Sequence, residues 1–331
     1  MSISIKNLFA ECRVHGNGEA QVMLTNWDIQ ILLHIMCRDL GVQLPIDLCA
    51  PNLEYYKIPM EVYESKDCGL SDVDLMHVFQ HVMSLNDDYS VYMKNLCALH
   101  RRRVKYSRIL STQMRADFEQ ISPRSLLEYG LAPSKLLCNW MLWRKWIYDI
   151  DNRSAQETGY LFEPIVAGCM GGAPVGAKCS PVKRVDKDGN QTKDGRQIDC
   201  YIPVEEKAYE LKLRVTIAAS GQGRWGEELS FPFECKVAGI TPYLLVLDPT
   251  PSHRLTDLIK AYEAAGGFYY LGEDAWAKME SEAGQIMGKF VEKYIRPPLQ
   301  DMSSIEPAAL DPVTMSWNPE TIEITSSGEV Y

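Results

Sequence analysis

Two short apolar segments joined by a polar turn constrain the fold of this chain more than any other feature. Residues 197–202 and 208–215 are rich in Ile, Val, Tyr and Leu, which favour strands, and Pro203 with a Glu-Glu-Lys run interrupts them. The pattern predicts an antiparallel hairpin whose turn is centred on Val204-Glu205. Such a turn fixes which residues of the two strands lie opposite each other.

Three charged residues of the predicted hairpin fall on one face. In this register Asp199 lies opposite Glu210, and Lys212 shares their face because side chains alternate along a strand. Paired carboxylates are hard ligands for Mg²⁺, and a lysine beside them can hold a phosphate or orient an attacking water. The same residues could also form an ordinary solvent-facing salt bridge. The apolar residues between the charged positions favour the edge of a buried sheet, and therefore a site.

Size and composition are those of a globular protein. The chain has 331 residues, 46% of them apolar and 10% aromatic, which allows two domains or one large domain with an accessory region. No run approaches the roughly 18 apolar residues that a membrane span needs, and the first residues lack the apolar core of a signal peptide. We therefore expect a cytoplasmic protein with no membrane contact. None of the ten cysteines forms a Cys-x-x-Cys pair, so we expect no structural zinc site. In a reducing cytosol we also expect no disulfides.

Charge is unevenly distributed along the chain. The net charge of −10 argues against a protein held to nucleic acid by bulk charge, but basic segments at 100–108 and 178–196 leave specific DNA binding open. The first segment could neutralise phosphates, or it could be the solvated face of a helix. Its cations are Arg101, Arg102, Arg103, Lys105 and Arg108.

The periodicity of the sequence changes near Asp151. Residues 1–150 have helical apolar patterns and caps, and we expect a mainly helical region that serves DNA binding, dimerisation or both. Residues 151–299 read as helix, three strands, helix, strand, helix, strand, which predicts an α/β fold with a mixed β-sheet flanked by helices. Residues 300–331 are rich in Pro, Ser and Glu and are expected to form an extended or disordered tail.

Some boundaries in this pattern are specific enough to check. A helix that starts at Ser134 is expected to be separate from a shorter helix at 157–163. The residues at 185–190 have the chemistry of a tight hairpin turn. The last long helix, from Glu273, is expected to stop before Pro297-Pro298.

The second half of the chain resembles the restriction-endonuclease-like core of the PD-(D/E)XK nuclease superfamily. That core has an Asp at the end of one strand and Glu-x-Lys on the next, which Asp199, Glu210 and Lys212 match. Glu163 matches a Glu on the preceding helix, whereas Ile198 stands where the motif has proline.

The resemblance implies a role for each of these residues. Asp199 and Glu210 would hold Mg²⁺ against the scissile phosphate of double-stranded DNA, with the Leu211 carbonyl as a further ligand. Lys212 would orient or activate the attacking water. Glu163 would assist a metal or its water shell, although a helix Glu beside aromatic residues is often only a surface charge.

Three stretches are also similar to type II restriction endonucleases of the ApaLI family, namely 210–214, 221–229 and 244–250. This similarity implies a homodimer that cuts a palindromic hexamer such as GTGCAC, and a partner DNA methyltransferase that protects the host. In the middle stretch, Gln222 and Arg224 could read adenine and guanine in the major groove, or could belong to an ordinary capped loop.

Two other functions stay open on the sequence alone. The carboxylates could form a non-catalytic surface pair in a DNA-binding or structural relative. Alternatively, the nuclease could act in repair or recombination and select DNA structure instead of sequence. Discrete fragments from plasmid DNA in Mg²⁺ are expected only from a sequence-specific endonuclease.

Overall fold

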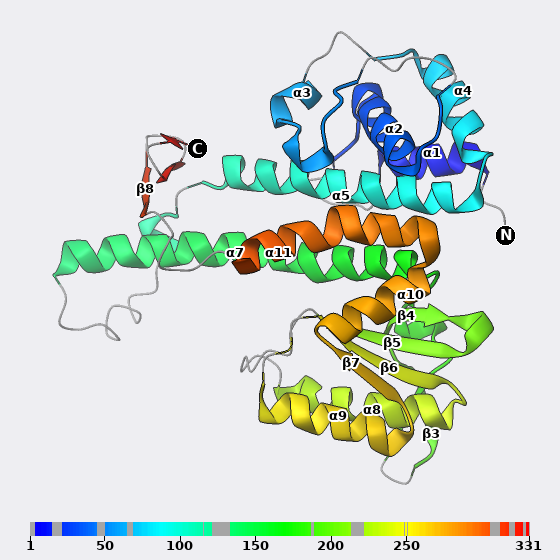
Figure 1. Ribbon diagram of the computed structural model, residues 1–331. Helices are drawn as coiled ribbons and strands as arrows, with labels where there is room; N and C mark the ends of the chain where they lie inside the picture. Colours follow the sequence, from blue (N-terminus) through cyan, green and yellow to red (C-terminus); the bar gives the residue numbers. More distant parts are fainter. Residues whose placement is uncertain are drawn as a thin grey trace.

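The computed structural model describes residues 4–14, 22–44, 50–64, 69–114, 116–120, 133–186, 189–212, 222–247, 249, 251–304, 312–317, 322–326 and 329–330. Three parts follow one another across the molecule (Figure 1): a helical N-terminal region, the long helix α7 (Ser134–Cys169), and a β-sheet with helices on both faces. The chain is therefore mixed α/β with a helical N-terminal region, as predicted.

The N-terminal region is built of helices whose ends carry ordinary capping residues. In α2, the Thr25 hydroxyl accepts from the Asp28 N–H while Asp28 accepts in return from the Thr25 N–H, and Gly41 ends the helix with φ 68°. Residues 27–33 of α2 are all buried, so this helix forms the centre of the region. The helices are α1 (Ile5–Arg13), α2 (Asn26–Leu40), α3 (Met60–Glu64), α4 (Asp72–Met83) and α5 (Asp87–Thr112), with 3₁₀ turns η1 (Tyr55–Lys57) and η2 (Phe118–Gln120).

Helix α7 is longer than the sequence predicted. The separate helices expected at 134 and at 157–163 are one continuous helix of 36 residues, and the predicted boundary after residue 150 falls inside it. The sequence has no glycine or proline between residues 134 and 158, so nothing in the backbone ends the helix where the composition changes. Helix α7 lies between α5 and the sheet and contacts both of them (Figure 1).

The main sheet has five strands in the order β1-β4-β5-β6-β7. β1, β4 and β5 are antiparallel neighbours, whereas β5, β6 and β7 are parallel, so the sheet is mixed as predicted. The short hairpin β2–β3 forms beside it around the predicted turn at 185–190. Strand bounds are β1 (Ala173–Val175), β2 (Lys183–Val185), β3 (Gln191–Gly195), β4 (Ile198–Ile202), β5 (Lys207–Lys212), β6 (Thr241–Val246) and β7 (Phe268–Leu271).

Register in the β4–β5 hairpin is the one that the sequence predicted. Cys200 pairs with Tyr209, and Ile202 pairs with Lys207, which centres the turn between residues 204 and 205. The turn itself is a 3₁₀ turn, η4 (Pro203–Glu205), and a second one, η3 (Ala177–Cys179), follows β1.

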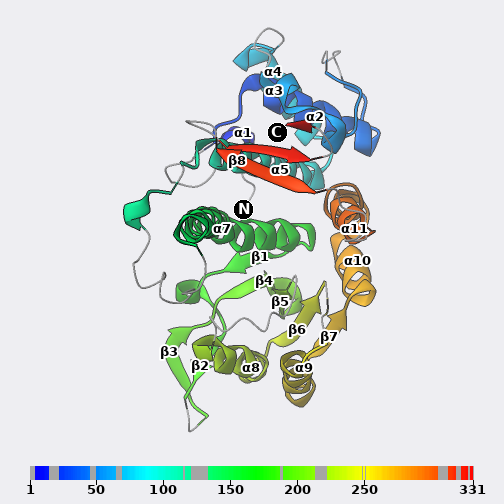
Figure 2. The same cartoon turned by 90° about the vertical axis from the view of Figure 1, so that its left-hand side faces the viewer.

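Helices cover both faces of the sheet (Figure 2). On β6, Leu244 and Val246 pack with α8 (Gln222–Val237) and α9 (His253–Ala265). The alternate residues Tyr243 and Leu245 pack with α7 and α10 (Glu273–Phe290) on the other face. On β5, Ala208 belongs to the α8–α9 face, so Glu210 and Lys212 point to the same face at the end of the strand.

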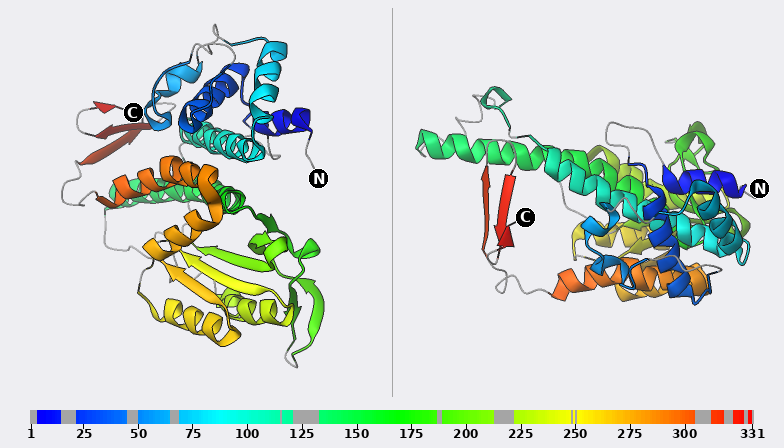
Figure 3. Two further views of the ribbon diagram at one scale, coloured as in Figure 1. Left: turned by 45° about the vertical axis from the view of Figure 1, so that its right-hand side comes forward. Right: turned by 90° about the horizontal axis from the view of Figure 1, so that it is seen from above.

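The last helical segment does not stop before Pro297-Pro298, as the sequence predicted. The chain continues from α10 through a π-helical turn (Val291–Ile295) into α11 (Arg296–Ser304), with Pro297 and Pro298 in the first turn of α11, where a helix tolerates proline. Beyond it, β8 (Val313–Trp317), β9 (Ile322–Ser326) and β10 (Glu329–Val330) form a small antiparallel sheet beside α7 (Figure 3). Trp317 of β8 stacks on Trp143 of α7, with ring centroids 4.5 Å apart. Among the described residues, no helix is long and apolar enough to cross a membrane.

Candidate active site

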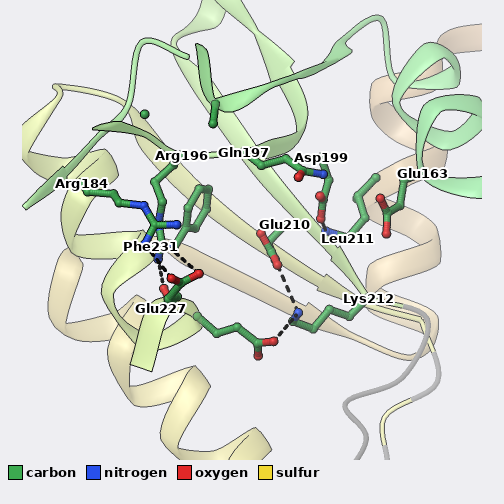
Figure 4. A pocket seen from close by; sticks show the side chains of 13 residues that line it. Glu163, Arg184, Arg196, Gln197, Asp199, Glu210, Leu211, Lys212, Glu227 and Phe231 are labelled. Carbon is green, nitrogen blue, oxygen red and sulfur yellow. Dashed lines mark hydrogen bonds and ion pairs between the residues drawn. The ribbon is translucent and has the colours of Figure 1, made fainter. Parts of the chain in front are cut away.

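A pocket of about 600 Å³ opens at the end of β5, between the sheet, α8 and the β2–β3 hairpin (Figure 4). It brings together all five residues predicted as catalytic or as metal ligands. The residues that line it are Glu163, Ala177, Arg184, Gly195, Arg196, Gln197, Asp199, Glu210, Leu211, Lys212, Glu227, Glu228 and Phe231.

Asp199 and Glu210 stand on adjacent strands just beyond the last paired residues of the hairpin. The N–H of Leu211 donates to Asp199 Oδ2 at 3.0 Å, which fixes the carboxylate against the end of β5. Burial raises the pKa of Asp199 well above its ordinary value, and the negative charges of Glu210 and Glu163 raise it further. The two strands therefore hold carboxylates that repel each other, and the Leu211 N–H and the charge of Lys212 offset this repulsion only in part.

Lys212 is the cation closest to these carboxylates. Its Nζ lies 3.1 Å from Glu210 Oε1 and 3.5 Å from Glu228 Oε1 on α8. Burial alone would lower the pKa of Lys212, but the surrounding carboxylates, Glu210 first, outweigh it and raise that pKa. The ammonium group is consequently charged at neutral pH.

Glu163 reaches the pocket from α7, on the side opposite α8. Figure 4 shows its carboxylate next to Asp199 and Leu211. Burial raises the pKa of Glu163, the charge of Glu210 raises it further, and Lys212 partly offsets this. The pocket thus carries a local surplus of negative charge, with Glu163, Asp199, Glu210 and Glu228 around one lysine.

This donor set suits a divalent cation that is bound jointly with a phosphate. Within the described part of the chain, no three His, Cys, Asp or Glu side chains are grouped closely enough to chelate a metal on their own. Mg²⁺ usually takes only one or two protein carboxylates and completes its shell with water and phosphate oxygens. Asp199 and Glu210 supply such a pair, and the surplus negative charge of the pocket attracts a cation electrostatically.

Metal-free stability should depend on pH because of this cluster. The folded-state pKa of Asp199 is raised above the value near 3.9 of an unfolded chain, so its contribution to stability is fully present below about pH 3.9 and is lost as pH rises through the folded-state pKa. We therefore expect Asp199→Asn, in chelator, to unfold a few degrees higher than wild type near neutral pH. The difference should vanish towards about pH 3.9; thermal unfolding of both proteins across this range measures it, and a constant difference would contradict the assignment.

The basic helix α5 does not reach the pocket, because α7 lies between α5 and the sheet (Figure 1). The predicted phosphate contact of Arg101 needs correction: the side chain is buried and donates to the backbone carbonyls of Glu11 and Cys12. Arg103 is half-buried, 4.8 Å from the ring centroid of Tyr55. Arg102 and Lys105 are half-buried and Arg108 is exposed, all on α5.

The predicted base-reading residues Gln222 and Arg224 lie in the first turn of α8, the helix that supplies Glu227, Glu228 and Phe231 to the pocket lining. Their side chains lie outside the described part of the structure.

Several pocket residues were not predicted from the sequence. Glu228 binds Lys212, and Arg184 and Arg196 bind Glu227 on α8. Glu227 and Glu234 are seven residues apart, so they share a helix face, and the basic segment 178–196 precedes them. The shared helix face of the two glutamates and the basic segment before them are the sequence signals that could have indicated the ion pairs between α8 and the two arginines.

The mixed sheet, its flanking helices and the carboxylate–lysine set are the features expected from the resemblance to the PD-(D/E)XK nucleases. A family model described as ApaLI-like restriction endonuclease matches residues 49–296. The type II restriction enzyme ApaLI of Acetobacter pasteurianus is 47% identical over 261 residues, which cover 78% of this chain and 68% of that enzyme. No solved structure matches the chain.

The chain therefore belongs to the ApaLI-like restriction endonuclease family. This places it among the type II restriction endonucleases, which are site-specific deoxyribonucleases.

Proposed function

We propose that this protein is an Mg²⁺-dependent endonuclease that cuts both strands of DNA at a palindromic hexamer such as GTGCAC. The observation that carries this proposal is the convergence of Asp199, Glu210 and Lys212 in one pocket of a chain from a restriction endonuclease family. A solvent-facing salt bridge would not need a third carboxylate from α7 in the same pocket.

Each residue of the pocket has a task in this proposal. Asp199, Glu210 and the Leu211 carbonyl would hold the ion beside the scissile phosphate. The bound ion would polarise a phosphoryl oxygen and lower the pKa of a water molecule. Lys212, which is charged at neutral pH, would hold a phosphate oxygen or orient the attacking water. Glu163 would accept hydrogen bonds from water around the ion.

The assembly follows from the symmetry of the substrate. A palindromic site has two equivalent scissile phosphates, so a homodimer would place one pocket on each strand. We assign DNA binding, dimerisation or both to the helical region 1–150, where α5 carries its exposed and half-buried cations. A cognate DNA methyltransferase in the same cytoplasm would protect host DNA from the enzyme.

Digestion of DNA of known sequence tests the proposal. Purified protein should cut a plasmid into discrete fragments with Mg²⁺, leave it intact in chelator, and cut at one hexameric sequence when the fragment ends are read. Intact plasmid in Mg²⁺ would favour a non-catalytic DNA-binding relative. Cleavage at branched or damaged DNA without sequence preference would favour a repair nuclease.

A further inference from the structure

Two arginines stand at the end of the pocket nearest the β2–β3 hairpin, and they differ in how firmly they are held. Arg196 is fixed: its side chain is 7% exposed, and its Nε lies 2.5 Å from Glu234 Oε2. The same guanidinium donates to the Glu227 carbonyl and to the Ser230 hydroxyl, the latter at 3.0 Å. These contacts with α8 fix Arg196 and, with it, the chain directly after β3.

Arg184 is held much less firmly. Its Nη1 lies 2.6 Å from Glu227 Oε1, and the two side chains are 41% and 42% exposed. An ion pair at this exposure contributes little free energy, so another anion can replace Glu227 at small cost. Glu227 Oε2 also lies 3.5 Å from Arg196 Nη1, so the carboxylate keeps a cationic partner when Arg184 turns away.

The position of Arg184 suits a phosphate of the DNA strand that passes through the pocket. Figure 4 shows Arg184 at one end of the pocket and Asp199 with Glu163 at the other. A guanidinium makes planar, two-point contacts with phosphate oxygens. Arg184 also belongs to the basic segment 178–196, the part of the sequence pattern that the catalytic proposal leaves without a role.

We propose that Arg184 binds a backbone phosphate of the DNA strand near the scissile bond, and that Glu227 is its counterion in the free enzyme. The inference rests on the proposed function, because it takes DNA as the ligand. DNA binding exchanges the Arg184–Glu227 pair for an Arg184–phosphate pair, while the buried Arg196–Glu234 pair stays in place. Glu227 therefore competes with DNA for Arg184.

Salt-dependent DNA binding tests this exchange, with a duplex that the wild type cuts and with chelator present so that no cleavage occurs. Arg184→Ala should weaken binding about tenfold and reduce the slope of log K against log salt by about 0.9, the value for one lost phosphate contact. Glu227→Gln should instead tighten binding several-fold, because the competing charge is gone. The double variant should bind like Arg184→Ala alone.

A control and a second readout keep the outcomes distinct. Lys260→Ala removes one exposed charge from α9 outside the pocket and should leave the slope unchanged. An unchanged slope for Arg184→Ala, or weaker binding by Glu227→Gln, would show a purely structural ion pair and overturn the inference. Should Arg184→Ala fail to fold, Arg184→Gln, which keeps most of the side chain, takes its place in the slope measurement and in the double variant. Absence of wild-type cleavage in Mg²⁺ would instead overturn the proposed function.

Discussion

Replacing Asp199 by asparagine is expected to lower the rate of DNA cleavage by about 10³-fold, because it removes a charge worth several kcal/mol to the metal-assisted transition state. Asparagine keeps an oxygen that can accept from the Leu211 N–H, which lies 3.0 Å from Asp199 Oδ2 in the native enzyme, so the local fold should persist. DNA binding should persist or become tighter in chelator, since one negative charge near the phosphate is lost. Single-turnover cleavage and binding of the same duplex measure the two effects separately.

A matched variant distinguishes loss of the site from loss of any acid. Asp257→Asn removes an exposed carboxylate from α9, outside the pocket lining, and should cleave at the wild-type rate. If Asp199→Asn also cleaves within about tenfold of wild type, which is about 1.4 kcal/mol of activation free energy, the carboxylate is not a metal ligand for the reaction.

Lys212→Gln should lower cleavage by about 10²- to 10⁴-fold, the range typical for loss of a group that positions or moves a proton in the transition state. The expected effect on metal binding differs from that of Asp199→Asn. Glu210 loses its partner at 3.1 Å and Glu228 loses its partner at 3.5 Å, so the pocket becomes more negative and should bind a divalent cation at least as tightly as wild type.

Lys236→Gln is the control for the lysine variant, because Lys236 is exposed on α8 and does not line the pocket. It should leave both cleavage and metal binding unchanged. If Lys212→Gln loses metal binding together with cleavage, Lys212 holds the carboxylates in place and has no direct role at the phosphate.

The sequence predicted the part of the fold that depends on local signals. The turn at Pro203 and the alternation of apolar residues set the β4–β5 register, and that register was enough to place Asp199 beside Glu210. The strand β6 and the helix α9, which Gly266 ends at φ 78°, were predicted for the same reason. These features depend on residues that are close together in the chain.

What the sequence did not predict depends on contacts between distant segments. Arg196 and Glu234 are 38 positions apart in the sequence, and their pairing depends on how α8 packs beside the hairpin. Arg101 belongs to a run of cations that read as a surface patch, but the packing of α1 against α5 buries it under the carbonyls of Glu11 and Cys12. The continuity of α7 was missed because a change in composition was interpreted as a break in structure.

The measurement that tests the central claim most directly is binding of Mn²⁺, as a probe for Mg²⁺, to the enzyme–DNA complex, followed by the loss of the free-ion electron paramagnetic resonance signal. Wild type and Lys212→Gln should both bind the ion, and Asp199→Asn and Glu210→Gln should each bind it much more weakly. Equal binding of Mn²⁺ by wild type and both carboxylate variants would contradict the claim that these two residues hold the catalytic metal.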